Sequence, residues 1–106
     1  MDLASVLLDR GSAKDIQEAL ELAAVDVQNR RSAAALFVLA RAQLAAGLAK
    51  EALATSREIL RTGVKDSDYF YQMSLVQKAV KNLRQAKIYL DQSVKTNPSN
   101  FLVIQN

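Results

Sequence analysis

The sequence predicts an all-α protein built from about three antiparallel helical hairpins. Half of the 106 residues are hydrophobic, and there are only 3 glycines and 1 proline. Strong helix formers such as Ala, Leu, Lys and Gln are abundant, and no stretch alternates β-branched with polar residues as a strand would. Six segments with apolar residues at helical spacing are separated by short polar breaks, which make successive helices antiparallel neighbours.

The first two predicted helices are delimited by a glycine and a capping serine. Residues 3–10 carry leucine and valine on one side and stop at Gly11. Ser12, with Asp15 three residues later, fits a capping pattern in which the serine hydroxyl accepts a backbone hydrogen bond. The second helix is expected to fade near residues 29–31. Its apolar face is expected to contain Ile16, Ala19, Leu20, Ala23 and Val27.

The middle two helices flank Gly47. Ser32 is a favourable N-cap for a helix over residues 33–46. Glycine then suits the left-handed position that follows many helices. The next helix is expected over residues 50–61, before Gly63.

The last two helices are bounded by caps and by the single proline. Asp66 or Ser67 is expected to cap a helix that reaches about residue 80, and Asn82 caps the next one. Pro98 lacks an amide hydrogen and disfavours helix at the residue before it, so it marks the end of the sixth helix. One stripe of the sixth helix is expected to face inward, namely Leu83, Ala86, Leu90 and Val94.

An internal repeat organises the chain. Residues 33–66 and 67–100 align without a gap over 34 residues. Small residues allow two helices to approach closely, and larger residues fill the space beside them. The paired positions are Leu36 and Phe70, Leu39 and Met73, Ala40 and Ser74, Gln43 and Gln77, Ala52 and Ala86, and Leu60 and Val94.

On these residues the chain resembles the tetratricopeptide repeat (TPR) family. The second unit fits the family pattern at Phe70, Met73, Ser74, Ala86, Leu90, Ser93 and Pro98. The first fits it at Leu36, Leu39, Ala40, Gly47 and Ala52. Both units depart from the family pattern where a glutamine, Gln43 or Gln77, replaces a tyrosine. The first unit also has Val64 where the family has a proline. The resemblance implies a TPR-like α-solenoid in which the hairpins stack.

The whole chain, residues 1–106, is expected to form one such domain. Residues 1–32 are expected to be an irregular helical pair, because QEALELA echoes KEALATS 33 residues further on. Residues 101–106, FLVIQN, are expected to be the stub of a next repeat. The alternative is that this apolar segment folds back as a lid on the sixth helix.

The composition argues against catalysis and against a metal or cofactor site. The chain has no cysteine and no histidine, which excludes disulfides, Cys/His metal sites and histidine-based catalysis. No phosphate-binding loop or catalytic motif is present. We therefore expect no enzymatic activity, no cofactor, no metal and no small-molecule substrate. With no signal peptide and no apolar run near the roughly 20 residues that span a bilayer, we expect a soluble protein, cytoplasmic by default, with no membrane span.

The expected function is a scaffold that binds a peptide or helix of a partner protein in a concave groove. The TPR resemblance implies that the first helix of each repeat lines this groove. Arg41 and Lys78 would select acidic groups, and aromatic and aliphatic residues would supply apolar contacts. Phe37, Leu44 and Leu75 could instead pack against the neighbouring repeat. The candidate groove residues are Phe37, Arg41, Leu44, Asp68, Tyr71, Leu75 and Lys78.

Two alternatives belong to other classes. Exposed end faces around residues 3–8 and 101–104 could make the chain a self-association module, for example a homodimer. A nucleic-acid surface is disfavoured because residues 1–32 hold six acidic and four basic residues, and no aromatic residues interleave with the basic cluster. That basic cluster consists of Lys78, Lys81, Arg84 and Lys87.

Overall fold

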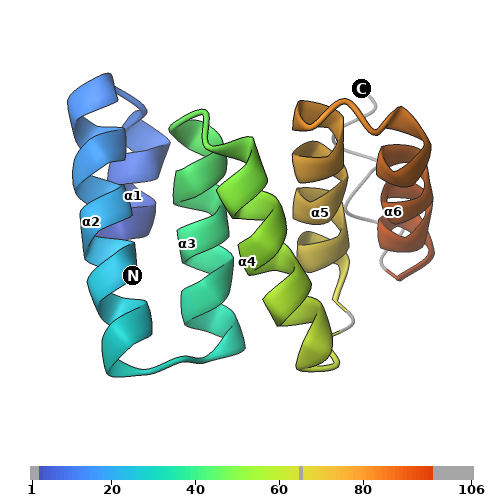
Figure 1. The fold of residues 1–106 in the computed structure, drawn as a ribbon, viewed down its shortest axis with the longest axis horizontal. Helices are drawn as coiled ribbons and strands as arrows, with labels where there is room; N and C mark the ends of the chain where they lie inside the picture. Colours follow the sequence, from blue (N-terminus) through green and yellow to red (C-terminus); the bar gives the residue numbers. More distant parts are fainter. Residues whose placement is uncertain (1–2, 65, 97–106) are drawn as a thin grey trace. The chain divides into compact units, whose positions relative to one another are not determined.

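The computed structural model describes residues 3–64 and 66–96, and every regular element within them is an α-helix. This confirms the all-α prediction. The helices of the described part are α1 (Leu3–Arg10), α2 (Ala13–Asn29), α3 (Ala33–Ala45), α4 (Ala49–Arg61), α5 (Ser67–Ala79) and α6 (Leu83–Thr96) (Figure 1). Their bounds lie close to those predicted. The predicted stop at Pro98 and the segment 101–106 lie outside the described residues.

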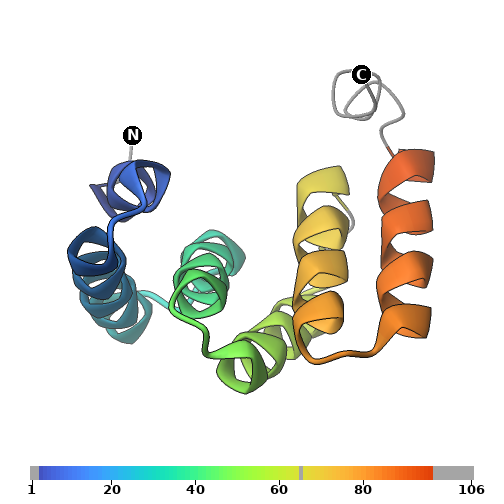
Figure 2. The same ribbon diagram turned by 90° about the horizontal axis from the view of Figure 1, so that it is seen from above.

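The helices fall into two compact units, Met1–Thr62 and Gly63–Asn106, and each is described by itself. In the first unit α1 packs on α2, α2 on α3 and α3 on α4, and α1 also contacts α3 (Figure 2). In the second unit α5 and α6 form one hairpin. The expectation of a single domain over residues 1–106 stays a prediction.

The core of the first unit is built mainly from small and aliphatic residues of α1, α2 and α3. Ile16, Leu20 and Val38 pack against it from the side and are partly buried. The predicted inward face of α2 is confirmed, because Ala19, Ala23 and Val27 are buried there as well. The residues of the central cluster are Ala4, Leu7, Leu8, Ala19 and Ala42.

Side-chain caps begin four of the helices as the sequence predicts, and at α6 the Asn82 side chain accepts from the Gln85 N–H at 3.3 Å. Ser12 and Ser32 each accept a hydrogen bond at 3.1 Å from the backbone N–H three residues later. Asp66, and not Ser67, caps α5 by accepting from the Tyr69 N–H at 2.8 Å. Each such cap typically contributes about 1 kcal/mol, so these polar residues fix where the helices start.

The 34-residue repeat of the sequence is also a repeat of local backbone structure. The helices α3 and α5 both have 13 residues, and their ends lie 34 positions apart. The following turns correspond too, with left-handed φ angles of +81° at Gly47 and +64° at Lys81. In both turns an N–H donates at 2.8 Å to the carbonyl five residues earlier, from Leu48 to Gln43 and from Asn82 to Gln77.

The predicted inward stripe of α6 is wrong at two of its four positions. Leu83 is 67% exposed and Leu90 is 38% exposed, whereas Ser93 is fully buried. The Ser93 hydroxyl donates at 2.7 Å to the backbone carbonyl of Ser67 on α5, and the two hydroxyls lie 3.3 Å apart. This close contact requires a small polar side chain and turns the Ser93 side of α6 inward. The two leucines keep exposed surface instead.

An ion pair joins the segment before α3 to α4. The guanidinium of Arg31 donates to both carboxylate oxygens of Glu58. These hydrogen bonds, together with the positive charge of Arg31, hold the pKa of the Glu58 carboxyl below its usual value and raise the pKa of Arg31. The pair ties two stretches that lie 27 residues apart.

The Glu58 pair predicts a pH dependence of stability. A carboxyl whose pKa is lower in the folded chain stabilises the fold above its unfolded pKa of about 4.3, and this contribution is lost as the pH falls through the folded value. We expect Glu58→Gln to lower the urea midpoint at neutral pH and to remove this part of the acid-side decline. Urea titrations between about pH 3 and pH 7 measure this. Glu18→Gln, at an exposed carboxylate, should leave the profile unchanged; equal profiles for all three proteins would contradict the prediction.

The two corresponding turns predict opposite effects of substitution. Left-handed backbone is strained for residues with a Cβ, so we expect Lys81→Gly to stabilise the chain by about 0.5–1 kcal/mol. Gly47→Ala should destabilise it by about 1 kcal/mol. No atom lies within 4 Å of the position of an added Cβ at Gly47, so this cost comes from the backbone alone. Thermal unfolding followed by circular dichroism measures both changes. A Lys81→Gly variant less stable than the parent would contradict the account.

Candidate interaction surface

Three of the predicted groove residues lie along one face of α3. Phe37, Arg41 and Leu44 follow one another at spacings of four and three residues, which places them on the same side of a helix. All three are half-buried, so part of each side chain is accessible. The structure therefore brings these residues together within the first unit.

The other four predicted residues lie along α5 in the second unit. Asp68 and Lys78 are exposed, Leu75 is 38% exposed, and Tyr71 is half-buried. Their spacings of three, four and three residues again keep them on one side of the helix. Because the two sets belong to separate units, each forms its own surface, and their union into one groove stays a prediction.

The accessible faces of α3 and α5 occupy corresponding repeat positions. Phe37 corresponds to Tyr71, Arg41 to Leu75 and Leu44 to Lys78, and none of the six is fully buried. The intervening repeat positions turn inward instead, since Ala40 and Ser74 are both buried. Both hairpins thus expose the same helix face, although the chemistry of that face differs between them. We call these two faces the α3 face and the α5 face.

Arg41 already has a carboxylate partner, which the sequence did not reveal. Its Nη2 lies 2.6 Å from Oδ1 of Asp9 on α1, and the two side chains are 39% and 64% exposed. The partners are 32 residues apart and share no local motif. Among the described residues Lys78 makes no ion pair. The positive charge of the α5 face is therefore the more available of the two.

The interior behind these faces is unexpectedly polar. Thr55 of α4 donates to Oε1 of Gln43 at 2.7 Å, which ties α3 to α4. The corresponding glutamine of α5, Gln77, is also buried. Tyr69 packs its ring against Phe70 with 5.5 Å between centroids, and burial raises its pKa to about 12, with a smaller contribution from Tyr89. These groups hold the helices together and lie apart from the accessible faces.

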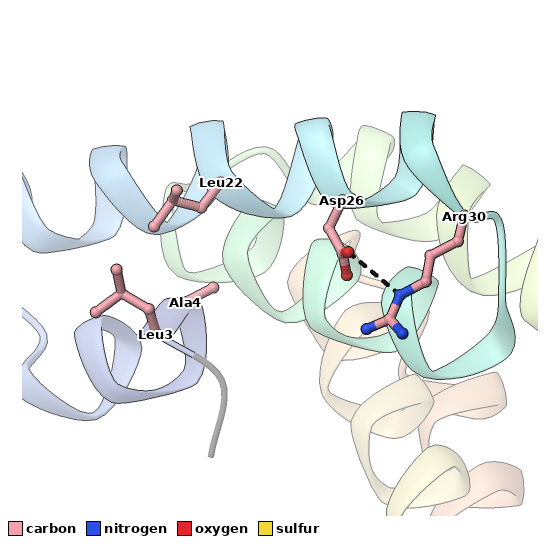
Figure 3. Close-up of a pocket in the computed structure, with 5 residues that line it drawn as sticks. All are labelled: Leu3, Ala4, Leu22, Asp26 and Arg30. Carbon is pink, nitrogen blue, oxygen red and sulfur yellow. Dashed lines mark ion pairs between the residues drawn. The ribbon is translucent and has the colours of Figure 1, made fainter.

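A cleft that the sequence did not predict lies between α1 and α2. It has a volume of about 470 Å³ (Figure 3). It is lined by Leu3 and Ala4 of α1, by Leu22 and Asp26 of α2, and by Arg30 just after α2. None of the predicted groove residues lines it. Leu22 forms part of its apolar wall, and an ion pair of 3.4 Å joins Asp26 to Arg30.

Neither a metal site nor a membrane-spanning element is found in the described part of the chain. Within residues 3–64 and 66–96, no three His, Cys, Asp or Glu side chains gather closely enough to hold a metal ion. No helix in the same ranges is both long and apolar enough to cross a bilayer.

Comparisons of this chain with protein-family models, with curated proteins and with solved structures found no match. The TPR resemblance rests on the residues of the chain itself. The local backbone repeat of the two hairpins is an independent observation made within each unit.

The exposure of the Asp9–Arg41 pair predicts weak coupling between the two residues. Exposed ion pairs typically contribute about 0.2–1 kcal/mol, so Arg41 can exchange Asp9 for a carboxylate of a partner. We expect a double-mutant cycle with Asp9→Asn and Arg41→Gln to give a coupling energy in this range, measured by urea unfolding. A coupling well above 1 kcal/mol would make Arg41 a structural residue and remove it from the α3 face.

Proposed function

We propose that this chain is a non-catalytic, TPR-like interaction module that binds a peptide or helix of a partner protein along the α3 and α5 faces. The observation that carries the proposal is the matched accessibility of these faces, at positions 34 residues apart. Packing of the helices alone does not require the same side of α3 and of α5 to stay accessible to solvent.

The repeat-like construction supports a solenoid arrangement of the hairpins. Corresponding helices have equal length, corresponding turns share a left-handed residue, and small residues occupy buried positions such as Ala40 and Ser74. Stacked helical hairpins create extended concave surfaces lined by one helix of each pair. In this arrangement a bound segment would run across both faces and contact each in turn.

The side chains define the kind of segment that fits. Phe37 and Tyr71 offer large aromatic surface that loses little rotamer freedom on binding. Leu44 and Leu75 add aliphatic contact, and Lys78 presents an ammonium group to a carboxylate. Asp68, in the first turn of α5, would disfavour a second acidic group nearby. The preferred ligand is an apolar segment that carries a carboxylate near Lys78.

Catalysis is not part of the proposal. The chain holds no histidine or cysteine to act as nucleophile or as acid and base near neutral pH. Burial raises the pKa of Tyr69 to about 12, which makes its phenol a weaker proton donor, and its ring is buried. The accessible groups are suited to contact and charge recognition.

A random peptide library displayed on phage and selected on the immobilised chain tests the proposal. We expect enrichment of peptides with apolar residues and a carboxylate, because these complement the two faces. Fluorescence anisotropy with the selected peptides should show that Tyr71→Ala and Lys78→Glu each weaken binding by about tenfold or more. Lys50→Glu changes an exposed lysine on α4 and serves as the matched control.

The outcome that contradicts the proposal is equally specific. Selected peptides that bind the parent, Tyr71→Ala and Lys78→Glu equally well would place the binding site elsewhere. A selection that enriches no peptide above background would remove the peptide-binding function altogether. Circular dichroism of each variant confirms that the helices are retained.

A further inference from the structure

The outward side of α2 is acidic and apolar. Leu22 is 37% exposed and Val25 is 54% exposed, and the carboxylates of Glu18 and Glu21 lie on the same side of the helix. Glu21 accepts a hydrogen bond from Gln17 at 3.4 Å. Neither glutamate takes part in an ion pair with another described residue. We call this surface the acidic face.

The cleft between α1 and α2 adjoins the acidic face, because Leu22 belongs to both (Figure 3). Its apolar wall also includes Leu3, which is 57% exposed. The Asp26–Arg30 pair offsets its own charge, so the negative charge of this side of α2 comes from the two glutamates. The exposed Lys14, four residues before Glu18, reduces that charge by one. The surface therefore combines a cleft, lined partly by aliphatic residues and partly by the Asp26–Arg30 pair, with adjacent carboxylates.

The outward side of α6 has the opposite charge. Its exposed large apolar residues are Leu83, at 67%, Ile88, at 42%, and Leu90, at 38%. Three exposed cations accompany them along the helix, with Asp91 as the single carboxylate of α6. The cations are Arg84, Lys87 and Lys95. We call this surface the basic face.

The repeat accounts for only part of the basic face. At the corresponding positions of α4, Ala49 stands for Leu83, Leu53 for Lys87 and Ser56 for Leu90. Ser56 is buried, whereas Leu90 is exposed. Arg84 and Lys95 correspond to Lys50 and Arg61 of α4, so these two cations belong to the repeat. Lys87 and the exposed Leu83 and Leu90 are specific to α6.

We propose that the basic face of α6 in one copy of the chain docks on the acidic face of α2 in a second copy, with Leu83 entering the cleft beside Leu22. Charge complementarity selects this occupant, since the acidic and basic faces differ in sign and both offer apolar contact. Two copies can meet reciprocally, with both acidic–basic contacts made in a closed dimer, or head-to-tail, with one acidic and one basic face left free. The association goes beyond peptide binding and uses none of the α3 or α5 face residues.

Sedimentation velocity of the full chain, from low micromolar to near-millimolar concentration at low salt, measures the association. We expect the average mass to rise with concentration and to fall again when salt is added, because salt screens the exposed charges. Two charge-reversed variants test the faces. One carries Glu18→Lys with Glu21→Lys, and the other carries Arg84→Glu with Lys87→Glu. Each should raise the apparent Kd by about tenfold or more, because like charges then meet.

Mixing the two variants provides the decisive measurement. The first has two basic faces and the second has two acidic faces, so an equimolar mixture restores opposite charges at every contact. We expect the mixture to associate more strongly than either variant alone. The matched control, Lys50→Glu with Arg57→Glu on α4, makes the same formal charge change as the second variant at exposed residues and should associate like the parent. Leu83→Ser should weaken association without any change of charge.

A parent chain that stays monomeric over the whole range, or a mixture no heavier than its components, would overturn the proposal. Circular dichroism verifies the fold of each variant. If a reversed variant loses helix, the neutral pairs Glu18→Gln with Glu21→Gln and Arg84→Gln with Lys87→Gln decide the question, and unchanged association in both contradicts it. Peptide binding measured on dilute, monomeric chain is independent of this result.

Discussion

Close packing of helices through small side chains is the constraint on which this structure depends. Ala19, Ala40 and Ala52 are fully buried, one in each of α2, α3 and α4. In the second unit Ser93 takes this part and reaches the backbone of α5. A larger side chain at such a position would force the helices apart and cost about 1–3 kcal/mol or more. The choice of inward side at these few positions decides which residues of every helix remain available to a partner.

The two hairpins combine one backbone plan with different surfaces. The turns at Gly47 and Lys81 have the same hydrogen bonds, yet the α3 face carries an arginine engaged by Asp9 and the α5 face carries a lysine without an ion-pair partner among the described residues. The helices α4 and α6 share exposed cations at corresponding positions, but Ser56 of α4 is buried whereas the corresponding Leu90 of α6 is exposed. Repetition therefore supplies geometry, and the specificity of each surface comes from residues that the repeat does not fix.

The sequence predicted the features that depend on neighbouring residues. Helix starts at Ser12 and Ser32 and the helix end before Gly47 follow from local capping rules, so their positions were accurate. The inward side of α6 was predicted wrongly because it depends on Ser93 meeting a carbonyl 26 residues earlier. The Asp9–Arg41 pair and the α1–α2 cleft were missed for the same reason, since distant segments create them. The TPR resemblance supplied the candidate residues of the two faces, whereas the Asp9 partner of Arg41 lies 32 residues away and could not be read from the sequence.

Nearly all helix contacts in each unit join elements that follow one another in the chain, with α1 and α3 as an added pair. Such a topology closes only short loops, which keeps the entropy lost before the first contacts form small. Low contact order of this kind is typical of proteins that fold within microseconds to milliseconds. During synthesis, α1 to α4 can pack before α6 has left the ribosome, so the nascent chain spends little time with unprotected apolar surface.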